Sequence, residues 1–342
     1  MIAEMWTEET LDRLLTEPSP ALIADVRKLD GGLMILGAGG KMGPTLAVLA
    51  KKAFAAAGKK DPVIAVSRFS DPAARGLLER EGVETISADL MEPGALEALP
   101  DAANIIFMAG RKFGTAGEEC LTWGMNAVLP SQVIRRFPAA RFTVFSSGNL
   151  YPMTPPHQGG ANEDTPPGPV GEYAMSCLAR ERIFEYASRT TGAKVLLYRL
   201  NYAVDLRYGV LYDIARKVLA GEEVDLATPC FNCIWQGDAN EYAIRSLLLA
   251  DSPAARLNVT GPETVSVRYA AARFGELLGR EVRFTGQPGE TALLSSSARC
   301  MAAFGYPRVP LDTLIDWQAQ WLLDGGRTLN KPTHFEERKG NF

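Results

Sequence analysis

Short apolar runs alternate with stretches of helical periodicity along the chain from residue 31 onward. Six runs stand out, LMILGAGG (33–40), PVIAVSRF (62–69), VETISADL (83–90), NIIFMAG (104–110), RFTVFSS (141–147) and KVLLYRLN (194–201). They are nearly continuous in Val, Ile, Leu and Phe, which is typical of strands that are covered on both faces. With helix-like stretches between them, the runs predict a doubly wound α/β fold with a parallel sheet and right-handed crossovers.

The segments outside these runs have other patterns. Residues 1–30 predict one or two short helices that pack on the core, with Thr7 as an N-cap before an acidic first turn. Residues 151–170 are a Pro- and Gly-rich loop between a predicted strand and helix, where folds of this type place ligands. From about residue 201 the pattern is less regular and predicts a smaller C-terminal α/β part.

Composition and charge exclude several classes of protein. The chain has 342 residues, of which 46% are hydrophobic and 22% charged, as in ordinary globular proteins. A net charge of −4 argues against a nucleic-acid partner. No apolar run approaches the roughly 18 residues of a membrane span, and the acidic start MIAEMWTEETL is unlike a secretory signal. The five Cys favour a reducing compartment. We therefore predict a cytoplasmic protein with no nucleic-acid or membrane partner.

Two cysteines, Cys230 and Cys233, have a spacing that zinc sites use. A zinc site needs about four ligands. The chain holds only three other Cys and two His, none of them in a second paired motif. We therefore interpret this pair as structural and predict no metal.

A glycine-rich segment follows the first predicted strand and opens a helix. Gly37, Gly40 and Gly43 recur at three-residue spacing, which permits a tight turn and close approach of a pyrophosphate to the backbone and the helix N-terminus. The strand–turn–helix context makes this spacing specific for a dinucleotide site. We expect the cofactor to contact Gly37, Gly39, Gly40, Lys41, Met42 and Gly43.

The end of the second predicted strand bears on which dinucleotide is bound. NAD sites usually place an acidic residue there, but this strand ends in Ser67 and Arg68. Arg68 can pair with a 2′-phosphate, and Lys41 adds positive charge, so we favour NADP over NAD. The alternative is that Arg68 only stacks on adenine or lies in solvent. After the third strand, Asp89 can reach the adenine amino group, with Leu90 beside it.

These motifs, in this order, resemble the extended short-chain dehydrogenase/reductases, a family of NAD(P)-dependent sugar epimerases and dehydratases. The motifs are GAGGKMG, MAGRK (108–112), WGMNAV (123–128), FSSGNLYP (145–152), YAMSCLARE (173–181) and LNVTGPETVSV (257–267). The resemblance spans about residues 31–325. It implies a Rossmann domain over 31–200 and about 231–262, and a substrate domain over 201–230 and 263–330. Residues 1–30 are then an N-terminal extension and 331–342 a tail.

The resemblance also implies roles for individual residues. Ala109, Gly110 and Asn126 would lie beside the cofactor, Ser147 would bind the substrate oxygen, and Tyr173 would be the acid–base. In the family a Lys four residues after the Tyr bonds the nicotinamide ribose and lowers the pKa of the Tyr. This chain has Cys177 there, and a thiol supplies no cation at neutral pH.

Three interpretations of Cys177 remain open. In the first, which we favour, the enzyme is active and positive charge comes from the oxidised dinucleotide or from Arg111 and Lys112. In the second, the chain binds the dinucleotide as a regulator with little turnover. In the third, Cys177 is itself reactive, which would require a lowered thiol pKa.

The predicted substrate is a small molecule, a sugar or sugar acid that is oxidised, epimerised or dehydrated. Its candidate contacts are Arg111, Lys112, Asn149, Asn201 and Arg207, of which the arginines and the lysine would suit an anionic group. His157 and His334 are candidates for supplementary roles, and the tail aromatics Phe335 and Phe342 for packing over the cleft or a partner subunit. Family analogy implies a homodimer.

Overall fold

A seven-stranded parallel sheet forms the centre of the computed structural model, which describes residues 6–112, 117–329 and 333–340. The strand order is β11-β6-β5-β4-β1-β2-β3. The strands are β1 (Leu33–Leu36), β2 (Val63–Ser67), β3 (Glu84–Ser87), β4 (Asn104–Phe107), β5 (Arg141–Ser147), β6 (Lys194–Leu200) and β11 (Ala255–Val259). All six strands predicted from the apolar runs are present, and the doubly wound α/β prediction is confirmed.

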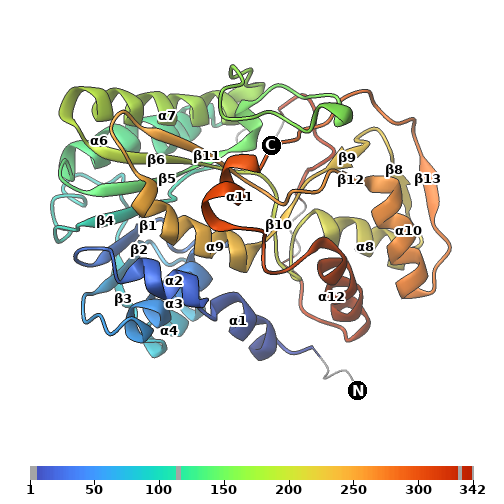
Figure 1. Cartoon of the computed structure of the whole chain (residues 1–342), viewed down its shortest axis with the longest axis horizontal. Helices are drawn as coiled ribbons and strands as arrows, with labels where there is room; N and C mark the ends of the chain where they lie inside the picture. Colours follow the sequence, from blue (N-terminus) through green and yellow to red (C-terminus); the bar gives the residue numbers. More distant parts are fainter. Residues whose placement is uncertain (1–5, 113–116, 330–332, 341–342) are drawn as a thin grey trace.

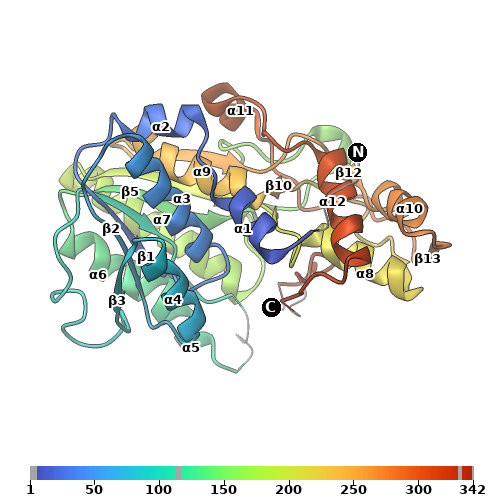
Figure 2. The same cartoon turned by 90° about the horizontal axis from the view of Figure 1, so that it is seen from below.

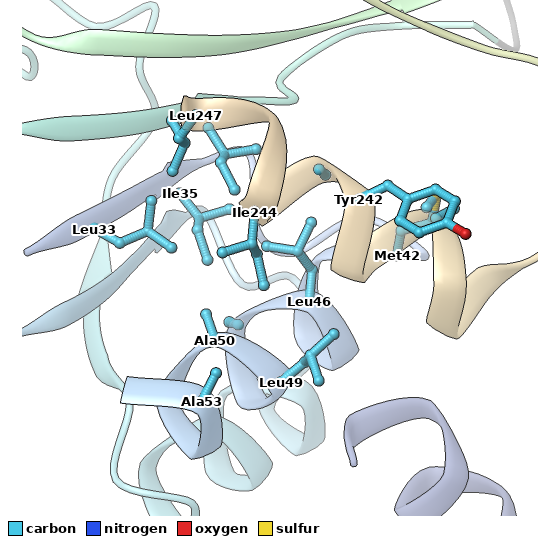
Figure 3. Packing of buried hydrophobic residues seen from close by; sticks show 14 of the residues in the cluster. Leu33, Ile35, Met42, Leu46, Leu49, Ala50, Ala53, Tyr242, Ile244 and Leu247 are labelled. Carbon is cyan, nitrogen blue, oxygen red and sulfur yellow. The ribbon is translucent and has the colours of Figure 1, made fainter. Parts of the chain in front are cut away.

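Helices cover both faces of this sheet, which explains why its strands are apolar on both sides (Figures 1 and 2). On β1, Leu33 and Ile35 pack in one cluster with α3 (Gly43–Ala56) and α9 (Gln236–Arg245). Figure 3 shows these side chains meeting between the sheet and the two helices. The alternate residues Met34 and Leu36 pack on the opposite face with α6 (Leu129–Arg136) and α7 (Gly171–Thr191).

The first two helices, α1 (Glu8–Thr16) and α2 (Pro20–Val26), pack on the body as predicted. Thr7 caps α1, because its hydroxyl accepts a hydrogen bond from the Thr10 backbone N–H. Ser19 caps α2 and also donates to the Glu241 carboxylate at 2.6 Å. These helices therefore tie the start of the chain to α3 and α9.

A second core lies beside the sheet, in the C-terminal part of the chain (Figure 1). It is built on α8 (Val210–Ala220), α10 (Val267–Leu278) and α12 (Leu311–Leu323), and Leu11 and Leu15 of α1 join it. Three strand pairs accompany it: β7 (Ala203–Val204) with β10 (Ile234–Trp235), β9 (Cys230–Phe231) with β12 (Val265–Ser266), and β8 (Glu223–Asp225) with β13 (Arg283–Thr285). Between β10 and β12 the chain returns to the main sheet, where α9 packs on one face and β11 forms an edge strand. The division of the chain into domains at the predicted boundaries stays a prediction.

The shorter helices fill the connections. They are α4 (Pro72–Arg80), α5 (Glu119–Trp123), the π-helix η1 (Gly124–Val128), η2 (Gly148–Leu150), η3 (Pro156–Gln158), η4 (Ser246–Leu249) and α11 (Ala298–Phe304). Over the described residues, no helix combines the length and apolar character that crossing a membrane requires.

Residues 333–340 of the tail run back over the molecule. Thr333 bonds Asp213 of α8 through its backbone N–H and its hydroxyl, and Phe335 packs edge-on to Phe231. At the far end, Gly340 touches Gly171, where α7 begins. The tail thus packs on the chain itself; the Phe342 prediction falls outside the described residues.

Candidate active site

A cavity of about 260 Å³ opens at the carboxyl ends of β1, β4, β5 and β6. This is the edge of an open α/β sheet where ligands bind. The loops after these strands line it together with α7, the start of α8 and Thr333 of the tail. The two cores therefore meet at this cavity, and the tail contributes to its wall.

The glycine loop forms one side of the cavity and fits a dinucleotide phosphate. A Cβ on Gly37 would lie 2.5 Å from the Ala109 backbone nitrogen, and one on Gly43 would lie 2.2 Å from the Ala38 carbonyl oxygen. Gly40 is exposed, so its backbone is open to a ligand. Helix α3 begins after Met42 without a side-chain cap, which leaves its first N–H groups available to an anion.

Ser147 and Tyr173 meet at the floor of this cavity. Ser147 ends β5, and Tyr173 lies in the first turn of α7. Burial raises the pKa of the Tyr173 hydroxyl far above its ordinary value, and the neighbouring Cys177 raises it further, while the Ser147 hydroxyl and the charge of Arg180 lower it. Without added positive charge, Tyr173 therefore stays protonated at neutral pH and cannot accept a proton.

Cys177 is a buried thiol without nucleophilic character. Only 1% of its surface is exposed, and burial raises the pKa of the thiol, against the opposing charge of Arg180. A reactive thiol requires the opposite shift. The interpretation of Cys177 as a nucleophile therefore has no support in this geometry.

Arg180 is a cavity residue that the sequence analysis missed. It lies on α7 beyond Cys177, with 5% of its surface exposed, and lines the cavity. Its Nη1 donates to the Phe145 carbonyl at 2.8 Å, and its Nη2 donates to Asn126 Oδ1 at 2.7 Å. The available signal was an Arg at i+7 from the Tyr, where a helix returns to the same face.

Asn126 lies in the π-helix, fully buried behind the cavity wall. Its Oδ1 also accepts from the Arg111 backbone N–H, and its Nδ2 donates to the Arg111 carbonyl and to Ser176 Oγ. Asn126 thus joins the loop after β4 to α7. It holds the wall together, and Gly110 and Arg111 of that loop line the cavity.

Cationic side chains dominate the polar lining. Among the described residues, the lining contains Lys41, Arg111, Lys112 and Arg180, and neither Asp nor Glu. Burial lowers the pKa of Lys41 to about 7 and that of Lys112 to about 8. Arg111 forms an ion pair with Glu118, and Lys112 Nζ lies 5.7 Å from the centre of the Tyr173 ring.

The Lys41 side chain points away from the predicted 2′-phosphate position. Its Nζ donates to the Ala203 carbonyl at 3.3 Å and lies 3.6 Å from the centre of the Tyr208 ring. The carbonyl and the ring attract the ammonium toward the C-terminal part of the chain. Lys41 therefore lines the same cavity as Ser147 and Tyr173, and its expected contribution at the adenosine end is corrected.

Asn149 and Asn201 also line the cavity. The Asn149 backbone N–H donates to Ser147 Oγ at 3.1 Å, and Asn201 Nδ2 donates to Asn232 Oδ1 at 2.9 Å. Arg207, in contrast, is absent from the described lining. Its guanidinium pairs with Asp205 and with Glu8 and Asp12 of α1, so its charge is neutralised and the structure contradicts its predicted role as an anchor.

The residues predicted for the adenosine end lie together after β2 and β3. Ser67 sits beside Gly39, since a Cβ there would come within 2.4 Å of Ser67 Oγ. Arg68 is largely exposed and lies 3.7 Å from the Asp89 carboxylate. Leu90 is buried. The Arg68 guanidinium is thus accessible to a ligand, but it already has the Asp89 carboxylate as a partner.

His157 and His334 are both exposed and are not among the described lining residues. Cys230 lies in the short strand β9, opposite Ser266 of β12, and Cys233 is buried. Both are free thiols. No group of three or more His, Cys, Asp and Glu that could hold a metal occurs within 6–112, 117–329 and 333–340.

Comparison with known proteins gives a family match and a set of similar structures. Residues 33–228 match the sequence model of the NAD dependent epimerase/dehydratase family. No curated protein matches the chain. A UDP-glucuronic acid 4-epimerase from Bacillus cereus, solved with NAD, superposes with a TM-score of 0.69 and 14% identity, covering 87% of this chain and 99% of that one.

Two further structures are similar over most of the chain. A Thermus thermophilus UDP-glucose 4-epimerase, solved with NAD, has a TM-score of 0.67 and 19% identity, with 84% of this chain and 97% of that one covered. An epimerase from Methanothermobacter thermautotrophicus has a TM-score of 0.70 and 15% identity, covering 90% and 96%. At these identities the likeness is one of fold.

Proposed function

The chain belongs to the NAD-dependent epimerase/dehydratase family, and on that premise we propose that it is an enzyme that uses a nicotinamide dinucleotide to epimerise, dehydrate or oxidise a sugar-like substrate. The observation that carries the proposal is the meeting of Ser147 and Tyr173 in one cavity with the glycine loop. A dinucleotide regulator would need the glycine loop but neither hydroxyl.

In this proposal Ser147 holds the substrate oxygen and Tyr173 moves its proton. The dinucleotide, held by the glycine loop and the N-terminus of α3, supplies the hydride chemistry. Tyr173 takes up the proton of a substrate hydroxyl when that hydroxyl is oxidised and returns it when the carbonyl is reduced. The Asn149 backbone N–H donates to Ser147 Oγ. The Ser147 hydroxyl is therefore held in place before a substrate binds.

The cationic lining supports a substrate that carries a carboxylate or phosphate. Lys41, Arg111 and Lys112 reach the cavity from two different loops, and its described lining includes no Asp or Glu that would repel an anion. Asn149 and Asn201 add hydrogen-bonding groups suited to hydroxyls. We therefore infer a polyhydroxylated, anionic substrate such as a sugar acid or a nucleotide sugar.

The test combines dinucleotide binding with a substrate panel. Trp fluorescence should report binding of NAD or NADP, and chromatography should reveal conversion of a member of a panel of sugar acids, nucleotide sugars and neutral sugars. Tyr173→Phe should lower turnover about 100-fold or more, the scale of general acid–base catalysis, with dinucleotide binding unchanged. Tyr186→Phe, on the exposed side of the same helix, is the matched control.

The raised pKa of Tyr173 and the missing Lys favour one alternative, a dinucleotide-binding regulator. In that case both dinucleotides or one of them would bind tightly, no panel member would be converted, and Tyr173→Phe would change nothing. Conversion of any panel member that depends on Tyr173 excludes the regulator.

For the cofactor we propose a preference for NADP, through Arg68. Its side chain is 66% exposed at the end of β2, where a 2′-phosphate could replace the Asp89 carboxylate as its partner. Arg68→Gln should then weaken NADP binding about tenfold and leave NAD binding unchanged. Equal effects on the two cofactors would contradict the preference.

We also propose a homodimer formed by α5, η1 and α7. These helices pack together and expose Leu121, Val128, Met175 and Tyr186, an unusual number of large apolar side chains for a solvated helical face. Sedimentation should give the mass of two chains, and Tyr186→Glu should reduce it to one. Tyr306→Glu, which removes an exposed Tyr elsewhere, should not.

A further inference from the structure

By the resemblance, Cys177 stands at the position of the family's Lys and carries no charge. The cavity beside it nevertheless contains a cation, Arg180. We propose that Arg180 supplies the fixed positive charge for Tyr173 and the nicotinamide ribose, in place of the Lys that Cys177 replaces. The role assigned to Tyr173 rests on the proposed function. The location of the charge stands on the structure alone.

Helix geometry puts Arg180 on the correct face. Tyr173, Cys177 and Arg180 are spaced i, i+4 and i+7 along α7, and residues so spaced share one side of a helix. The Cys177 side chain is short, so it leaves room through which a longer side chain from the next turn can act on the Tyr. Tyr173 and Arg180 both line the cavity.

The guanidinium is held by neutral groups. Its two Nη atoms donate to the Phe145 carbonyl and to Asn126 Oδ1, and Nε has no hydrogen-bond partner. Among the described residues Arg180 forms no ion pair, and the adjacent Glu181 pairs with Arg199 instead. A charge 95% withdrawn from solvent without a counter-ion is costly, which is typical of groups kept for function.

The surroundings leave space for this arrangement. A Cβ on Gly110 would lie 2.7 Å from Arg180 Nη2 and 3.2 Å from Asn126 Oδ1. A larger residue at position 110 would therefore have to displace the guanidinium from this place. The Phe107 ring lies on another side, 5.5 Å from Arg180 Cζ.

The electrostatic neighbours of the site agree with this assignment. The Arg180 charge lowers the pKa of both Tyr173 and Cys177 against the larger effect of burial, as expected for a cation that lines the same cavity as Tyr173. Lys112 also acts on Cys177, and the Glu181 carboxylate opposes it. Burial lowers the pKa of Lys112 on the loop after β4 to about 8, whereas two hydrogen bonds fix the Arg180 guanidinium on α7, so we assign Lys112 to the substrate and Arg180 to the permanent charge.

The first test needs no activity. Cys177→Lys places a second cation beside Arg180, and the two should repel. The melting temperature of Cys177→Lys should fall by about 3 °C or more, a change of roughly 2 kcal/mol for a chain of this size. In the double variant, Arg180→Met should recover most of that loss of melting temperature. The effects of the two substitutions on the melting temperature are then not additive. Additive effects would place the Arg180 charge elsewhere and overturn the proposal.

The second test uses turnover of the panel substrate. Arg180→Met should lower kcat about 100-fold and shift the acidic limb of the pH profile upward, because the Tyr173 pKa rises without the Arg180 charge, while Arg180→Lys retains most of the activity. Cys177→Lys should not raise kcat by itself but should rescue Arg180→Met. Arg182→Met, an exposed neighbour on α7, is the matched control.

The outcomes separate the two proposals. If Cys177→Lys alone raises turnover and Arg180→Met has no effect, the enzyme lacks a substitute cation and the inference is wrong. If no substrate is turned over by any variant, the proposed function fails, while the melting-temperature cycle still decides whether Arg180 occupies the position of the missing charge.

Discussion

Removing the positive partner of a fully buried ion pair should destabilise this protein strongly. Behind the cavity, Arg199 of β6 and Glu181 of α7 have 1% and 0% of their surface exposed. Arg199 donates to the Glu181 carboxylate from Nε at 2.9 Å and from Nη2 at 2.6 Å, and Ser146 donates at 2.6 Å. Arg199→Met would leave a buried carboxylate with one hydroxyl donor.

The cost follows from that burial. Breaking a buried pair by removing one partner costs about 3–5 kcal/mol. Unfolding entropy near 2.1 cal/mol/K per residue gives roughly 0.7 kcal/mol/K for a chain of 342 residues, so the melting temperature should fall by about 4–7 °C. Replacing both partners, as in Glu181→Leu with Arg199→Met, should restore part of the loss because no unpaired charge remains.

The assay is thermal unfolding followed by circular dichroism, with Arg216→Met as the control. Arg216 pairs with Glu222 at the surface, where the two side chains are 46% and 49% exposed, and such pairs contribute at most about 1 kcal/mol. The reasoning is refuted if Arg199→Met shifts the melting temperature no more than this control. It is also refuted if the double variant is less stable than the single one by the full cost of a second lost charge.

Three further predictions concern the glycine loop, one helix and the cavity lysine. Gly37→Ala should abolish dinucleotide binding in fluorescence titrations, since φ is +91° and its Cβ would meet Ala109; intact binding would contradict the site. Gly76→Ala, inside α4 where a Cβ would contact only the end of the Arg80 side chain at 3.4 Å, should stabilise the protein by about 0.5–1 kcal/mol in urea unfolding. Lys41 has a pKa lowered to about 7 from 10.5, so the unfolded chain keeps its proton to higher pH and stability should rise between these values. Lys41→Met should flatten that rise, and an unchanged pH profile would show that Lys41 is not responsible for it.

The fold and the backbone of the site could be predicted because local patterns encode them. Continuous apolar runs are required of strands that helices cover on both faces, and all six predicted strands join one sheet. The glycine loop could be predicted because its spacing and the strand before it lie within one short segment. Ser147 and Tyr173 followed from motif order, and the topology brings the ends of β5 and α7 to one cavity.

The partners and the location of each charged side chain depended on contacts that no local sequence pattern specifies. Arg207 looked like an anchor, but α1 brings Glu8 and Asp12 to it from almost 200 residues away. Lys41 was predicted to be a cofactor contact, but its ammonium lies over the Tyr208 ring inside the cavity. Arg180 drew no attention in the sequence, because its burial depends on Asn126 and the Phe145 carbonyl.

The sequence by itself determined the sheet and the glycine loop, since each rests on periodicity or on spacing within a short segment. The two hydroxyls followed from the resemblance to the family. Only the tertiary structure decided where the positive charge lies. Coulomb interactions and desolvation act through space and depend on which distant segments pack together. The resemblance to the family implies a Lys at the position of Cys177, and a thiol supplies no cation there. The packing of α7 against the π-helix places Arg180 beside that position.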